Sequence, residues 1–178
     1  KEMDRINKTD NERRKSLTKF KTHDMDGYYT VVERPGLQEF LDYIFNNFNV
    51  SIWTAASKDY ALFVIEKIIN IKKNRKLDWI MFSYHCDMST KEKKGSKDLN
   101  MLWDIFALDD YSNDTTVILD DHPDVHKLQK ERCIHIPPFD IDEPDFTNDT
   151  VLASLIEQFK KYKGNITKNV KNITKEIT

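Results

Sequence analysis

The chain has 178 residues, of which 39% are hydrophobic and 33% charged, and its formal net charge is -2. This length and composition indicate one globular domain with a substantial buried core. The charge gives no electrostatic basis for binding nucleic acid or an anionic membrane, and no apolar run approaches the roughly 20 residues that cross a bilayer. Two cysteines, Cys86 and Cys133, are too few for a disulfide framework, so free thiols in a reducing compartment are expected.

The first half of the chain alternates short apolar strands with amphipathic helices. A strand-like run at residues 28–32 follows Asp26-Gly27, a dipeptide typical of hairpin turns. Arg34-Pro35-Gly36 precedes a helical pattern over residues 37–48, in which apolar residues recur every three or four positions. A strand over residues 50–53, a second helix over about 58–70 and a strand over 79–82 follow.

The second half continues this alternation beyond a lysine-rich loop at residues 91–97. A helix is predicted over 98–106, and the clearest strand of the sequence, at 115–119, ends at Asp120-Asp121. A further strand spans 133–136, where Pro137-Pro138 ends it, and a last helix runs from about 148 to 162. The segment from Gly164, with its repeated Asn-Ile-Thr, is expected to be a polar and frayed tail.

Strands that alternate with helices of about 10–13 residues predict an α/β fold with a parallel sheet covered on both faces. Such sheets bind ligands beyond the carboxyl ends of their strands. This rule directs attention to three places: Thr54, the loop before Asp98, and Asp120-Asp121.

The residues at these places suit a bound phosphate when they are considered together. Alone, Asp120-Asp121 is most often a turn or a helix cap, Thr54 a cap, and Lys97 a solvated charge. Carboxylate oxygens are, however, the ligands that Mg²⁺ prefers. A metal-bound phosphate needs a cation and a lysine that neutralise its oxygens, and a hydroxyl that orients them.

Four segments of the chain resemble, in order, the phosphatases that act on the C-terminal domain (CTD) of RNA polymerase II. They are Arg34-Pro35-Gly36-Leu37, Ser51-Ile52-Trp53-Thr54-Ala55-Ala56-Ser57, Lys97-Asp98-Leu99 and Val117-Ile118-Leu119-Asp120-Asp121-His122-Pro123. This group includes the small CTD phosphatases and the NLI-interacting-factor-like proteins of the haloacid dehalogenase superfamily. The resemblance covers roughly residues 17–162.

The resemblance implies a fold and a domain organisation. The fold is a three-layer Rossmann-like parallel sheet of the haloacid dehalogenase type, with a small β-hairpin insertion near the N-terminus. Residues 1–163 are then a single phosphatase-like domain, in which 1–33 form a cap and hairpin segment and 34–163 the core. Residues 164–178 are the polar tail.

The resemblance also implies a Mg²⁺-dependent phosphoserine/phosphothreonine protein phosphatase that acts through an aspartyl-phosphate. Thr54 matches the phosphate-binding threonine, Lys97 the phosphate-stabilising lysine, and Asp120 and Asp121 the acidic Mg²⁺ motif. The expected partner is a phosphorylated protein or peptide, for which the CTD of RNA polymerase II is the commonest target in the family. Nuclear or cytoplasmic localisation is expected, without direct binding to nucleic acid or membrane.

The first motif of that family, Asp-x-Asp-x-Thr, which supplies the nucleophile, does not occur in the 178 residues. Asp24-Met25-Asp26 is a superficial candidate, but no Thr follows at the required place and Asp26-Gly27 indicates a hairpin. Two interpretations stay open. The residues begin after this motif in a longer protein, which the charged start without an initiator Met favours, or the chain is a catalytically inactive pseudophosphatase that binds a protein or phosphopeptide. Without the motif, the sheet is expected to lack its central strand.

Overall fold

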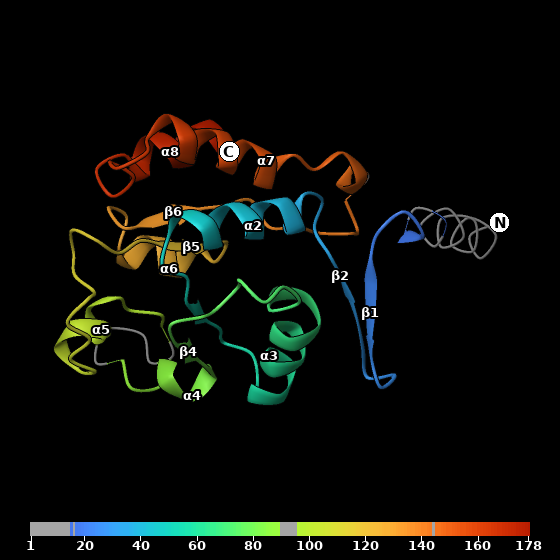
Figure 1. The fold of residues 1–178 in the computed structure, drawn as a ribbon, viewed down its shortest axis with the longest axis horizontal. Coiled ribbons are helices and arrows are strands. Elements are labelled where there is room, and N and C mark those ends of the chain that lie inside the picture. Colours follow the sequence, from blue (N-terminus) through green and yellow to red (C-terminus); the bar gives the residue numbers. More distant parts are fainter. Residues whose placement is uncertain (1–14, 16, 90–95, 144) are drawn as a thin grey trace.

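The computed structural model describes residues 15, 17–89, 96–143 and 145–178 (Figure 1). None of the helices in this part of the chain has the length and apolar character of a membrane-spanning segment. The elements, in chain order, are β1 (Thr22–Met25), β2 (Tyr29–Val32), α2 (Leu37–Asn47), β3 (Ile52–Trp53), α3 (Lys58–Val64), the π-helix η1 (Ile65–Ile69), β4 (Ile80–Met81), α4 (Ser83–Cys86), α5 (Asn100–Asp104), β5 (Ile118–Asp120), α6 (Pro123–Leu128), β6 (Cys133–His135), the 3-10 helix η2 (Phe146–Asn148), α7 (Val151–Lys161) and α8 (Val170–Ile177).

The strands form three two-stranded sheets. β1 and β2 pair antiparallel, β3 pairs with β4 in parallel, and β5 pairs with β6 in parallel, with Asp120 opposite His135. Within the described ranges β3 and β5 do not pair with each other. The parallel layer therefore consists of two halves instead of one continuous sheet, in agreement with the expected lack of a central strand.

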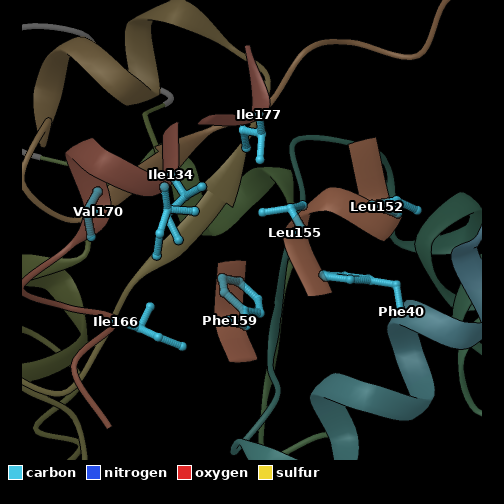
Figure 2. Packing of buried hydrophobic residues seen from close by; sticks show 9 residues of the cluster. Phe40, Ile134, Leu152, Leu155, Phe159, Ile166, Val170 and Ile177 are labelled. Carbon is cyan, nitrogen blue, oxygen red and sulfur yellow. The ribbon is translucent and has the colours of Figure 1, made fainter. Parts of the chain in front are cut away.

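Two hydrophobic clusters cover opposite faces of this layer. Val117 and Leu119 pack against the first cluster and Ile118 against the second, as expected because successive residues of a strand face opposite sides. Figure 2 shows that the first cluster brings together Phe40 of α2, Ile134 of β6 and side chains of α7 and α8. The second contains side chains of β3, β4, α4 and α5. Helices thus cover both faces, which confirms the predicted layered α/β class.

The predicted hairpin is formed by β1 and β2. Asp26 and Gly27 both have positive φ angles, 49° and 76°, which a tight hairpin turn requires. The Tyr28 N–H donates to the carbonyl of Met25 at 2.9 Å, and the Asp24 carboxylate accepts the N–H of Gly27 at 3.2 Å. The structure therefore confirms the hairpin interpretation of Asp24-Met25-Asp26.

Arg34, in the Arg-Pro-Gly segment that follows the hairpin, has a structural role. Its guanidinium makes a two-pronged contact with the Asp149 carboxylate, at 3.0 and 2.7 Å, and donates to the carbonyl of Pro137 at 2.8 Å. Asp149 also accepts the N–H of Val151 at 3.2 Å, at the start of α7. Arg34 thus fixes the chain that leads into α2 against the beginning of α7.

A buried acid connects the hairpin to α2. Glu33 is only 7% exposed, and its carboxylate lies 2.6 Å from Nε2 of His23, 2.8 Å from the Gln38 amide that donates to it, and 3.0 Å from Nζ of Lys21. Burial alone raises the pKa of Glu33, but hydrogen bonds from Gln38, His23 and Lys21 outweigh it and hold that pKa below its ordinary value. Glu33 is therefore ionised at neutral pH, and its protonation at acid pH weakens its interactions with His23, Gln38 and Lys21.

Arg75 extends this network to the loop after η1. Its side chain has 0% exposure, and its guanidinium donates to the side-chain and backbone oxygens of Gln38 at 2.8 and 3.0 Å, to the carbonyl of Ile69 at 3.0 Å and to the Asp42 carboxylate at 2.8 Å. Hydrogen bonds from Lys72 and Arg75 hold the pKa of Asp42 below its usual range. A single buried cation therefore joins α2 to η1.

The C-terminal segment is not a frayed tail, so that prediction is wrong. Ile166, Val170, Ile173 and Ile177 are buried in the first cluster, and α8 packs against α7 and β6. Val170, Ile173 and Ile177, which are three and four residues apart, lie on one face of α8, and Ile166 lies in the turn before this helix. In Figure 1, α7 and α8 accordingly lie together over the β5–β6 pair.

We predict that Arg75→Met lowers the free energy of unfolding by about 3 kcal/mol, because it removes the donors to the side-chain and backbone oxygens of Gln38 and to the carbonyl of Ile69. Lys72→Met is the matched control. Lys72 contacts the same carboxylate at 2.6 Å but is 48% exposed, so it should cost less than about 1 kcal/mol. Urea unfolding measures both. Equal losses would contradict the buried network.

We further predict that Ile173→Ala costs about 3 kcal/mol, because Ile173 is 0% exposed within the first cluster. Asn172→Ala, its exposed neighbour on α8, should change the stability by no more than about 0.5 kcal/mol. Thermal unfolding of the two variants decides the matter, since a frayed segment would give the same small effect for both.

Candidate functional site

The structure brings two of the four predicted site residues, Lys97 and Asp120, into direct contact. Nζ of Lys97 lies 2.6 Å from Oδ2 of Asp120, and the two side chains are 17% and 4% exposed. The other carboxylate oxygen, Oδ1, accepts the N–H of His122 at 2.9 Å. A carboxylate so well shielded from water needs these partners, because an uncompensated buried charge is costly.

Asp120 is positioned by the ladder between β5 and β6. Its carbonyl accepts the N–H of Ile136 at 3.1 Å, and Cys133 lies two residues before its pairing partner His135. Burial, and then the charge of Asp120, raise the pKa of the Cys133 thiol to about 12, although Lys97 opposes this effect. Cys133 therefore stays protonated at physiological pH and is not a thiolate nucleophile.

Asp121 differs from its neighbour because it is exposed. Its backbone carbonyl lies 3.0 Å from Nε2 of His135. Its carboxylate makes no hydrogen bond or ion pair with another residue of the described part of the chain. In the acidic pair, the carboxylate of Asp120 is thus bound to Lys97 and His122, whereas that of Asp121 is unengaged, that is, without a partner in the described residues.

These two carboxylates fit Mg²⁺ in chemistry and in number. The described ranges hold no group of three or more His, Cys, Asp or Glu side chains that could bind a metal. Mg²⁺, however, usually takes only one or two carboxylates and completes its octahedron with water and substrate phosphate. Asp121 has free oxygens for this purpose, and Oδ2 of Asp120 has a second lone pair beside Lys97.

Thr54 follows β3, and within the described structure no hydrogen bond joins it to Lys97, Asp120 or Asp121. Its N–H donates to the carbonyl of Met81 at 2.9 Å, and its Oγ1 accepts the N–H of Ala56 at 3.0 Å. The cap of α3 is instead Ser57, whose side chain accepts the N–H of Tyr60 at 3.4 Å. The Thr54 hydroxyl proton therefore remains available for a ligand oxygen.

Gln129, at the end of α6, also borders the site, although no sequence motif indicates it. Its side-chain amide hydrogen-bonds to the backbone of Lys97 and of Leu99. The sequence carries no signal for this contact, because more than thirty residues separate the amide from Lys97.

The Asp-x-Asp pairs in the sequence do not supply the missing nucleophile motif, because neither is followed by x-Thr. Asp24 and Met25 end β1, and Asp26 begins the turn of the hairpin. Asp140-Ile141-Asp142 lies in a loop, where the Asp140 carboxylate accepts the N–H of Asp142 at 2.8 Å.

Comparison with known proteins identifies the family of this domain. Residues 4–171 match the family model of the NLI interacting factor-like phosphatases, so the chain belongs to that family. This membership agrees with the predicted haloacid dehalogenase type of α/β fold and confirms the resemblance seen in the motifs.

Two viral proteins are similar over most of their length. The chain is 43% identical over 150 residues to the putative CTD phosphatase-like protein 355R of Invertebrate iridescent virus 3, which covers 81% of this chain and 80% of that protein. It is 42% identical over 148 residues to the protein of the same name from Invertebrate iridescent virus 6, with 80% and 81% covered. Among solved structures, Fcp1, an essential RNA polymerase II CTD phosphatase, aligns with a TM-score of 0.47 and 21% identity over 89% of this chain and 42% of that chain.

We predict that Lys97→Met lowers the free energy of unfolding by about 3 kcal/mol, because it removes the cation from a shielded carboxylate. Lys127→Met is the control, since Lys127 is 70% exposed and lies 3.6 Å from Asp124. It should cost about 0.5 kcal/mol or less. Denaturant titration measures both values, and similar values would show that Asp120 is not shielded.

Proposed function

We propose that this protein is a Mg²⁺-dependent phosphatase that hydrolyses phosphoserine or phosphothreonine in a protein through an aspartyl-phosphate. The observation that carries the proposal is the 2.6 Å contact of Lys97 with Asp120, beside the unengaged carboxylate of Asp121, in a member of a phosphatase family. A lysine and an acidic pair at the carboxyl end of a parallel strand are suited to a metal-bound phosphate.

Each of the four residues has a role in this proposal. The ammonium of Lys97 neutralises charge on the phosphate oxygens, and the hydroxyl of Thr54 donates a hydrogen bond that orients them. Asp120 and Asp121 would hold Mg²⁺, which would offset negative charge on the phosphate oxygens. The His122 N–H, bonded to Oδ1 of Asp120, leaves Oδ2 to face Lys97.

The nucleophile is the part of the proposal that the 178 residues do not carry in the form Asp-x-Asp-x-Thr. We propose that its carboxylate comes from a strand that pairs with the edges of β3 and β5, which have no partner in the described residues. A strand parallel to both would end near Thr54 and Asp120, where ligands of such sheets bind.

The relatives indicate the class of substrate. The viral relatives are described as CTD phosphatase-like, so we propose a phosphorylated protein segment, such as the CTD of RNA polymerase II, as the substrate. The comparisons give no support to the alternative of an inactive pseudophosphatase.

We predict that the full-length gene product hydrolyses an aryl phosphate in the presence of Mg²⁺, that chelation abolishes the activity, and that added Mg²⁺ restores it. Asp121→Ala should lower kcat/KM by at least roughly 100-fold, because the unengaged metal ligand is lost. Asp124→Ala, which removes an equal charge three residues away, should have little effect.

Three results would each refute the mechanism: hydrolysis without metal, unchanged activity in Asp121→Ala, or equal losses in the two variants. Binding of a phosphoserine peptide without any hydrolysis would favour the pseudophosphatase instead.

A further inference from the structure

The backbone of Lys97 and of Leu99 is held by one buried amide. Gln129 is 5% exposed. Its Nε2 donates to the carbonyl of Lys97 at 2.7 Å, and its Oε1 accepts the N–H of Leu99 at 3.0 Å. The segment itself belongs to no strand or helix.

A carboxamide that hydrogen-bonds in this way to two residues two positions apart replaces the backbone hydrogen bonds that a neighbouring strand would make. In a parallel ladder, the N–H of one residue donates to the carbonyl of position i of the facing chain, and its own carbonyl accepts the N–H of position i+2. The Gln129 amide supplies one donor and one acceptor in the same arrangement. Glu, which only accepts, and Met, which does neither, cannot replace it.

Gln129 is itself firmly placed. It ends α6, where its carbonyl accepts the N–H groups of Arg132 at 2.8 Å and of Cys133 at 2.9 Å at the start of β6. Asp120, at the end of β5, lies nine positions before Gln129 in the same β5–α6–β6 segment. Lys97 is therefore held twice, through its ammonium by Asp120 and through its carbonyl by Gln129, both from the β5–α6–β6 unit.

We propose that Gln129 is a positioning residue that fixes the Lys97 ammonium at the site. The inference concerns placement and depends on the proposed function only for its catalytic consequence. The rest of the segment has other anchors: Leu99 and Leu102 are buried, and both guanidinium amino groups of Arg132 donate to Oδ1 of Asn100 at 3.2 Å. Loss of the Gln129 amide therefore removes the contact that holds the Lys97 backbone and leaves the anchors of α5 in place, so that only Asp120 still holds the Lys97 ammonium.

Reductive methylation of the folded, full-length protein tests this directly. Mass spectrometry of peptides gives the rate at Lys97 relative to the exposed Lys127 in the same sample. Gln129→Met and Gln129→Glu should each raise this ratio by roughly tenfold, the effect of losing one or two hydrogen bonds. Gln158→Met is the matched control, because the Gln158 Oε1 on α7 has no hydrogen-bond partner among the residues that the structure describes. This variant should leave the ratio unchanged.

An unchanged ratio in both Gln129 variants would overturn the proposal, as would an equal rise at Lys97 and at the distant Lys72. Unfolding curves identify a variant that does not fold, and Gln129→Glu, which keeps the Leu99 contact, then decides the outcome. Kinetics separate this proposal from the phosphatase function. Faster methylation with a lower kcat supports both. Faster methylation with unchanged kcat supports the placement of Lys97 by Gln129 and refutes the catalytic role of Lys97.

Discussion

A shielded carboxylate at the end of β5 sets the main constraint on this molecule. Asp120 is 5% exposed, and its charge requires a cation that comes from another part of the chain, which Lys97 provides. Lys97 precedes the buried Leu99 of the second cluster, whereas Leu119, beside Asp120, packs against the first. Because β3 and β5 share no ladder in the described residues, side-chain contacts of this kind join the two halves of the parallel layer.

Most of the fold could be predicted because it leaves local signals. The spacing of Phe40 and Leu41 with their neighbours predicts α2, and Asp26-Gly27 predicts the hairpin. α4 and α6, with four and six residues, are too short to show periodicity. α8 has an apolar stripe of Val170, Ile173 and Ile177, but it is narrow and surrounded by Asn, Thr and Lys. A short helix of this kind is stabilised by its contacts with α7 and β6, which sequence alone does not reveal.

The candidate site was predictable as a set of residues but not as a geometry. Motif order singles out Thr54, Lys97, Asp120 and Asp121. Motif order does not reveal that Lys97 and Asp120 form an ion pair while the Thr54 side chain bonds to Ala56, because this depends on how loops far apart in sequence pack together. Gln129 shows the same limit more strongly. A lone glutamine belongs to no motif, and its hydrogen bonds to the backbone of Lys97 and Leu99 are known only from the structure.

The π-helix η1 requires a fixed number of residues in this part of the chain, although η1 contains none of the sequence motifs. Its wider turn, with the Asn70 N–H donating to the Ile65 carbonyl at 2.8 Å, contains one residue more than an α-helical turn would. Ile68 and Ile69 turn their carbonyls to Gln38 and Arg75 there. Deletion of one residue from η1 would regularise the helix and yet rotate these carbonyls away from their donors. Homologues of different length in this region therefore need a different way to accommodate a buried arginine.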